Sequence, residues 1–264
     1  MELRPGQLKQ SFCYPLFQDK GQSLDELFAM AREIGYAATE LWGWDDSLAS
    51  IVEAARRKHL AVASISGHGS IDDGLNDATQ HDRIEEELKR SIEAAAQHEI
   101  PGVICFSGTR RPGVSDMEGL AIAVKGIRRV TALAEEKGVN LNLEILNSRV
   151  DHPGYMADTV DWGIAFCEAA NSPRCRLLFD IYHVQIMEGD VIRALRRAAP
   201  YLGHLHTAGN PGRNELDDHQ ELNYRGICNA LVELGYDGYI GHELIVKRQS
   251  RAEALRSSFV ACTV

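Results

Sequence analysis

Four apolar stretches in the second half of the sequence each end on a side chain that can bind a metal ion. Each stretch has the length and composition of a buried β-strand, and the terminal residues are Glu144, Asp180, His206 and Glu243. The intervals between them are 36, 26 and 37 residues, each about one strand, one loop and one helix. When parallel strands close into a barrel, their carboxyl ends meet on one face, so residues far apart in sequence converge there. The spacing therefore predicts a parallel barrel whose site is built from four strand ends.

These four side chains form an oxygen-rich ligand set, because three are carboxylates and one is an imidazole. Such donors suit Mg²⁺, Mn²⁺ or a similar divalent ion better than a structural zinc bound by thiolates. A carboxylate at the end of an apolar strand is poorly solvated and needs a partner, either a metal or an arginine. Each acid alone is compatible with a structural salt bridge, but the four together favour one divalent ion, Mg²⁺ or Mn²⁺.

The rest of the sequence shows the alternation of helix and strand that such a barrel needs. A helical pattern ends at a glycine and an apolar run follows at Gly35, Gly138 and Gly235. This alternation is typical of parallel βαβ units. A chain of 264 residues is also close to the roughly 250 that one (β/α)₈ barrel contains. We therefore expect a single TIM barrel of the α/β class over residues 1–264.

Local patterns predict the individual elements. We expect strands at residues 9–14, 36–41, 60–65, 103–106, 139–144, 176–180, 201–206 and 239–243. We expect helices at 23–34, 46–59, 78–98, 116–137, 158–170, 190–199 and 222–234, with a shortened helix after residue 251. Ser23 and Glu26 form a capping box at the start of the first helix. The loops at 66–70 and 207–221 follow strand ends, where catalytic loops of such barrels lie.

Composition narrows the class of partner. The chain has 28 Lys and Arg against 38 Asp and Glu, and this net charge of −10 argues against nucleic acid as a partner. Six scattered cysteines without a Cys-x-x-Cys pair are expected to be reduced core thiols. The N-terminal residues lack the apolar core of a signal peptide, and no run of about 18 apolar residues could span a bilayer. We therefore expect no membrane association and a cytoplasmic location.

Three longer blocks surround the strand ends. They read Leu141-Asn-Leu-Glu-Ile-Leu-Asn-Ser148 with Asp151-His-Pro-Gly-Tyr155, then Phe179-Asp-Ile-Tyr-His-Val-Gln-Ile-Met-Glu-Gly-Asp190, then His204-Leu-His-Thr-Ala-Gly-Asn-Pro-Gly-Arg213-Asn-Glu-Leu-Asp-Asp218. The blocks resemble the hydroxypyruvate isomerase family, which belongs to the xylose isomerase-like TIM barrels alongside ketose 3-epimerases. The resemblance covers nearly the whole chain. It is also compatible with a homo-oligomer.

The resemblance implies a role for each strand-end residue. Glu144, Asp180, His206 and Glu243 would ligate the metal ion, and the two glutamates would also act as the acid and base. The resemblance further implies substrate roles for His183 and Arg213.

Further residues are candidates for the substrate pocket. A carboxylate substrate entering an acidic protein needs a planar cation, which suits Arg213 for two-pronged binding. Asn147 and His152 follow Glu144 and are weaker candidates for substrate contacts. His68 lies in a flexible glycine loop that could bring it to the mouth of the barrel. Three more residues at or near strand ends could line the pocket, namely Glu40, Trp42 and Phe106.

The most specific interpretation is an enzyme that interconverts hydroxypyruvate and 2-hydroxy-3-oxopropanoate by metal-assisted proton transfer through an enediolate. Its substrate would be a small hydroxy-oxo acid or a sugar. A 2-oxo-tetronate isomerase and a ketose 3-epimerase are alternatives of the same kind. An endonuclease IV-like nuclease is a more distant alternative, which the net charge disfavours. A non-catalytic barrel that binds sugar acids is disfavoured because the four-residue site is intact.

Overall fold

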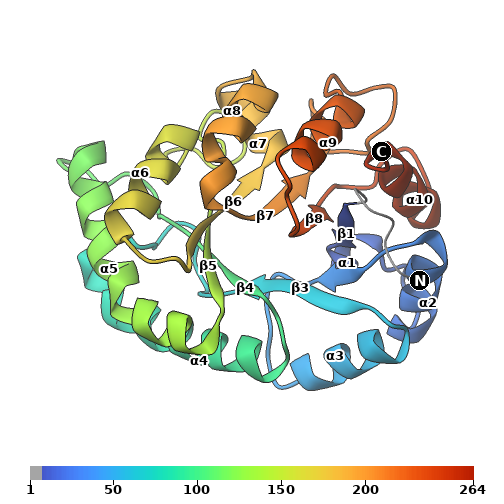
Figure 1. Ribbon diagram of the computed structural model, residues 1–264, viewed down its shortest axis with the longest axis horizontal. Coiled ribbons are helices and arrows are strands. Elements are labelled where there is room, and N and C mark those ends of the chain that lie inside the picture. Colours follow the sequence, from blue (N-terminus) through green and yellow to red (C-terminus); the bar gives the residue numbers. More distant parts are fainter. Residues whose placement is uncertain (1–7) are drawn as a thin grey trace.

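The computed structural model describes residues 8–264, so the first seven residues, where a signal peptide was not expected, lie outside the description. Eight parallel strands form the inner wall of a barrel, and helices surround it (Figure 1). The strands are β1 (Lys9–Phe12), β2 (Ala38–Glu40), β3 (Ala61–Ser66), β4 (Gly102–Cys105), β5 (Asn140–Glu144), β6 (Cys175–Asp180), β7 (Leu202–Thr207) and β8 (Tyr239–His242). The predicted TIM barrel is confirmed.

Hydrogen bonding between strands runs in the order β1-β8-β7-β6-β5-β4-β3-β2, so the seam of the barrel lies between β1 and β2. An isolated parallel bridge between Cys13 and Glu40 joins the two strands there. Aromatic packing supports this seam from outside, because the ring of Phe12 contacts Phe17, Phe28 and Tyr36 edge-on. The barrel is therefore nearly closed, with side-chain packing reinforcing its least hydrogen-bonded side.

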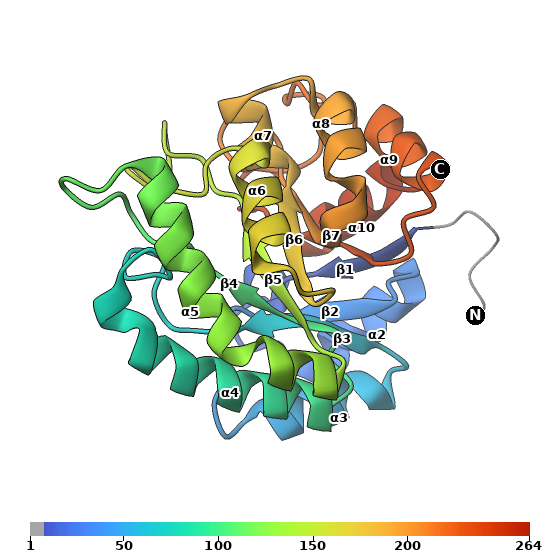
Figure 2. The ribbon, with the colours of Figure 1, turned by 60° about the vertical axis from the view of Figure 1, so that its left-hand side comes forward.

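The outer helices alternate with the strands along the chain (Figures 1 and 2). They are α2 (Leu24–Ile34), α3 (Leu48–Arg57), α4 (His81–Gln97), α5 (Asp116–Lys137), α6 (Val160–Ala170), α8 (Val191–Ala198), α9 (Tyr224–Glu233) and α10 (Arg251–Ala261). The predicted capping box at Ser23 and Glu26 is present. Gly138 ends α5 in the left-handed conformation, with φ of 73°, which glycine adopts without a steric penalty.

Two short helices were not expected. The first predicted strand ends early, and α1 (Tyr14–Phe17) follows it with Pro15 in its first turn, where proline costs no hydrogen bond. After β6 the chain forms α7 (Ile181–Met187), whose first amide groups donate to the side chain of Asp180. Aspartate is a favoured helix cap, so one residue both ends a strand and starts a helix.

Two expectations from composition can be compared with the structure. All six cysteines are buried free thiols, as expected. Across residues 8–264, none of the helices combines the length and the apolar character that a membrane span requires.

Candidate metal centre and substrate pocket

The barrel brings the four strand-end residues together. Each of Glu144, Asp180, His206 and Glu243 offers one ligand atom, and these atoms all lie within 4.8 Å of one another. All four residues are buried, with at most 5% of their surface exposed. His206 Nδ1 lies 3.2 Å from Glu144 Oε1 and 3.3 Å from Glu243 Oε2. The convergence inferred from the spacing is thus present at the carboxyl ends of β5 to β8.

The register of the sheet explains this convergence. Asp180 of β6 pairs with His206 of β7, which in turn pairs with Gly241 of β8, two residues before Glu243. Neighbouring strands therefore end at nearly the same height in this part of the barrel.

Burial and charge displace the pKa values of the two glutamates in opposite directions. Burial raises the pKa of Glu144, and the nearby charge of Glu243 raises it further. The hydrogen bond from His206 lowers this pKa but does not offset the two other effects. Burial also disfavours the charged form of Glu243, but Arg213 and His206 outweigh it and lower its pKa below the usual value. Two acids whose environments push their pKa values apart are suited to the complementary tasks of acid and base.

One unpartnered carboxylate oxygen indicates that the site fits a divalent cation. One oxygen of Asp180, Oδ1, accepts from the amide groups of Tyr182 and His183 at 2.8 and 3.2 Å. The other oxygen, Oδ2, has no hydrogen-bond partner, and neither has His183 Nε2, which lies 3.7 Å away. A buried carboxylate oxygen without a partner, beside two further carboxylates, needs a positive charge. The donor set suits a hard divalent ion.

His183 and Asn147 form a pair behind the carboxylates. His183 Nδ1 lies 3.2 Å from the amide nitrogen of Asn147, which donates to it, so the ring proton belongs on Nε2. Burial lowers the pKa of His183 well below its usual value, so the ring is a neutral donor. Asn147 is fully buried, and its side chain is occupied by His183 and Asp151. Asn147 thus supports His183, and neither residue is among those that line the cavity described below, so the expected substrate contacts of both stay predictions.

A cavity of about 440 Å³ opens onto Glu144 and Glu243. Trp42, His68 and Phe106 line it, as expected. The lining combines polar side chains with four apolar ones, namely Ile71, Ile104, Phe106 and Leu146. Glu40 is not part of the lining, because it is buried and bonded to histidines inside the barrel.

Arg213 lies on the wall of this cavity, and its guanidinium group bonds to Glu243. Its Nε has no partner, so the planar cation retains an unused donor. The loop that carries Arg213 is attached to the loop after β8, because the amide of Ile245 donates to the carbonyl of Arg213 at 2.7 Å. Glu215 strengthens this attachment by accepting from three consecutive amides of residues 247–249. The position of the cation is therefore built into two loops.

His68 lines the cavity and has one ring nitrogen without a hydrogen-bond partner. Its Nε2 accepts from the amide of Phe106 at 2.9 Å, while Nδ1 has no partner. Burial lowers the pKa of His68 to about 4, so the ring is neutral near pH 7 and its proton lies on Nδ1.

One contact was missed by sequence reasoning. The indole of Trp42 donates to Glu243, which lies 201 residues further along the chain. No local pattern in the sequence signals this pairing.

The pH dependence of metal binding follows from Asp180. Burial raises the pKa of this carboxyl to about 6, so below that pH a proton would compete with a metal ion for its oxygen. The affinity for Mn²⁺ is expected to fall roughly tenfold per pH unit below about pH 6. Calorimetric titration between about pH 7.5 and about pH 5 measures this, with circular dichroism to show that the protein stays folded. An affinity that does not change over this range contradicts the assignment of Asp180 as a ligand.

The comparisons with known proteins identify the family of the chain. The model of the xylose isomerase-like TIM barrel family matches residues 28–259, and the chain belongs to that family. A 2-oxo-tetronate isomerase of Cupriavidus necator is 37% identical over 147 residues, 55% of this chain and about half (53%) of that protein. A putative hydroxypyruvate isomerase of Homo sapiens is 28% identical over 227 residues, 81% of this chain and 80% of that protein.

The solved structures include a D-psicose 3-epimerase determined in the presence of D-fructose. It has a TM-score of 0.79 at 20% identity, and the match covers 96% of both chains. At this identity the likeness establishes the fold alone. The names of the sequence relatives confirm the expected class of protein, an isomerase-type enzyme.

Proposed function

We propose that the protein interconverts hydroxypyruvate and 2-hydroxy-3-oxopropanoate. The observation that carries this proposal is the pair of buried glutamates, with pKa values displaced in opposite directions, at one oxygen-rich cluster. Moving a carbonyl between adjacent carbons requires a proton to leave one carbon and another to reach its neighbour. Two carboxylates at one site can perform both transfers.

Glu144, Asp180, His206 and Glu243 would hold the divalent ion. Once bound there, the ion would polarise the substrate carbonyl and stabilise negative charge on its oxygens. One glutamate would remove the proton from the hydroxymethyl carbon, giving an enediolate. The hydroxyl proton would pass from the oxygen of that carbon to the former carbonyl oxygen, and the other glutamate would deliver a proton to the former carbonyl carbon. Both glutamates would be ionised as ligands of the ion, so each is available to accept a proton in one direction of the reaction and to return it in the other.

Other residues would hold the substrate. His183 offers its Nε2 proton to a substrate oxygen beside Asp180. Arg213 binds the substrate carboxylate through its planar cation, which also offsets the charge of the acidic cluster. His68 offers a further donor from the cavity wall.

A second candidate, an isomerase of four-carbon 2-oxo acids, has specific support. The relative from Cupriavidus necator with 37% identity is named a 2-oxo-tetronate isomerase. The cavity of about 440 Å³ holds more than ten water volumes of roughly 30 Å³ each, so a three-carbon acid fills only part of it.

A substrate series separates these functions. The Mn²⁺-loaded protein would be assayed with hydroxypyruvate, 2-oxo-tetronate and D-fructose, and kcat/KM would be compared. We expect the highest value with hydroxypyruvate. A higher value with 2-oxo-tetronate favours the four-carbon reaction, and turnover of D-fructose alone favours epimerisation. Cleavage of DNA at abasic sites by the same preparation would instead support a nuclease.

Replacement of Arg213 tests carboxylate binding. Arg213→Ala is expected to raise KM for hydroxypyruvate by about 30- to 150-fold, or about 2 to 3 kcal/mol, the range for a lost charge-assisted bond. Arg213→Lys is expected to recover only part of the lost affinity for hydroxypyruvate, because a lysine ammonium group does not reproduce the planar, two-donor geometry of the guanidinium group. Steady-state kinetics measure both variants. Unchanged KM in both shows that Arg213 does not bind substrate.

A further inference from the structure

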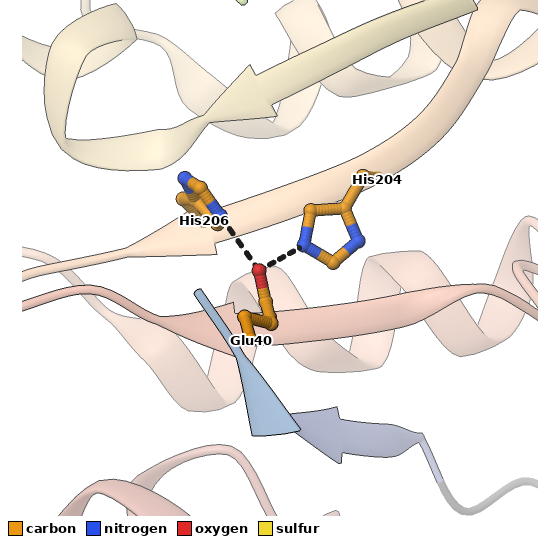
Figure 3. Close-up of side chains that lie close together, drawn as sticks. All are labelled: Glu40, His204 and His206. Carbon is orange, nitrogen blue, oxygen red and sulfur yellow. Dashed lines mark hydrogen bonds and ion pairs between the residues drawn. The ribbon is translucent and has the colours of Figure 1, made fainter. Parts of the chain in front are cut away.

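Glu40 ends β2, yet its carboxylate reaches across the barrel interior to β7. One oxygen, Oε2, lies 2.9 Å from His204 Nε2 and 3.1 Å from His206 Nε2 (Figure 3). The other oxygen, Oε1, accepts from the hydroxyl of Ser11 on β1. Glu40 and both histidines are at most 3% exposed. Three strands thus contribute to one buried hydrogen-bonded group.

The surrounding backbone leaves room for this carboxylate. Gly241 of β8 pairs with both Ser11 and His206 in the sheet. A Cβ at Gly241 would lie 2.1 Å from Glu40 Oε1 and 3.1 Å from His206 Cδ2, so a larger residue would displace the carboxylate. His204 and His206 face the same side of β7 because side chains alternate along a strand.

The contact determines which nitrogen of His206 faces the strand-end acids. An ionised carboxylate only accepts hydrogen bonds, so the Nε2 of His206 must donate to Glu40. Nδ1 is then left facing Glu144 and Glu243, at 3.2 and 3.3 Å. An imidazole that ligates a metal ion must be neutral, so with Nε2 donating to Glu40 the lone pair lies on Nδ1.

We propose that Glu40 is a positioning residue of the metal centre, which holds His206 through Nε2 so that Nδ1 faces the ion. The inference rests on the proposed function, because it requires that His206 be a ligand. Ser11 and His204 fix the carboxylate in turn. Glu40 touches neither the substrate cavity nor the other strand-end acids, so its effect passes through His206. Partners that orient a ligating histidine in this way commonly influence metal affinity strongly.

A second ion bound by Glu40, His204 and His206 is the competing interpretation, since these three side chains also group closely enough for a metal. The hydrogen bonds argue against it. None of the buried nitrogen and oxygen atoms of these three side chains lacks a partner, whereas Asp180 Oδ2 does. The group around Glu40 is therefore complete without a cation.

The test measures metal binding without substrate. In Glu40→Gln the dissociation constant for Mn²⁺, determined by calorimetry, is expected to rise about 10- to 100-fold. Selective ¹⁵N labelling of histidine, with Mg²⁺ bound, reports the position of the His206 ring proton by NMR. We expect the parent to show the proton on Nε2 and Glu40→Gln to show a mixture, because an amide both donates and accepts.

Replacing either of two buried serines perturbs the site less than replacing Glu40. Ser11→Ala removes the hydroxyl that holds Glu40 and is expected to weaken Mn²⁺ binding several-fold. Ser64→Ala is the matched control, because Ser64 is equally buried on β3 and its hydroxyl has no partner. The Ser64→Ala protein is expected to bind Mn²⁺ with the affinity of the parent. If Glu40→Gln does not fold, this pair decides, and equal affinities in both variants overturn the proposal.

The remaining outcomes are distinct. An unchanged Mn²⁺ affinity in Glu40→Gln, with the His206 proton still on Nε2, overturns the positioning role and leaves the proposed function intact. If calorimetry shows two ions per parent chain and one per Glu40→Gln chain, Glu40 is itself a ligand, and the positioning role is also overturned. A parent protein that binds no Mn²⁺ contradicts the metal centre itself.

Discussion

Exhaustive removal of divalent ions is expected to abolish turnover, and Mg²⁺ or Mn²⁺ is expected to restore it. Three carboxylates and one imidazole meet within 4.8 Å in a buried site, where their charges repel unless a cation joins them. The same cation would stabilise the charge that develops on the substrate oxygens. Dialysis against a chelator, metal analysis by mass spectrometry and rate measurements before and after metal addition test this together.

Asp180→Asn is the matched variant for this experiment. Asparagine also caps helices, so the start of α7 is retained while the charge of one proposed ligand is lost. Mn²⁺ at a concentration that saturates the parent should then fail to restore activity. Full turnover in protein shown to be free of metal would refute the metal-assisted mechanism.

Glu144→Gln and Glu243→Gln are each expected to reduce kcat by at least about a hundredfold, the lower range for a positioned acid or base. Both side chains flank the same cluster, so each can serve one of the two proton transfers. Rates should be measured at saturating substrate and with metal occupancy verified, because glutamine also weakens a ligand. In deuterated water the product of the parent is expected to carry deuterium at the carbon that receives the proton.

Glu136→Gln is the control for the change of charge. This glutamate is exposed on α5 and pairs with Lys137, so its loss should leave kcat unchanged. If product forms without solvent deuterium and either active-site variant retains near-normal kcat, the two-glutamate mechanism is wrong.

Much of the fold and the core of the candidate site follow from local patterns in the sequence. The periodicity of apolar residues identifies the eight strands and the longer outer helices, and the glycines mark where several helices end. Parallel connections force the carboxyl ends of the strands onto one face of the barrel. Glu144, Asp180, His206 and Glu243 could therefore be grouped from their spacing alone, because this consequence of topology does not depend on the packing of any particular side chain.

The contacts that cross the barrel could not be predicted in this way. Glu40 and His206 are 166 residues apart, and their hydrogen bond depends on the closure of the sheet beside β1 and on the space at Gly241. His204 and His206 alternate in β7, which signals a shared face, but nothing local shows that Glu40 reaches them. The seven-residue helix α7 is likewise not predicted, because the sequence marks its cap, Asp180, only as the end of a strand.

The different chemistry of the two glutamates is the clearest property that tertiary structure alone provides. In sequence, Glu144 and Glu243 are the same residue at equivalent positions, each at the end of an apolar strand. In the folded protein both are buried, which raises the pKa of a carboxyl, but Arg213 bonds to Glu243. The loop after β7 brings this arginine to one glutamate through contacts with the loop after β8. A pKa depends on the charges and the burial around a group, and both exist only once the chain has folded.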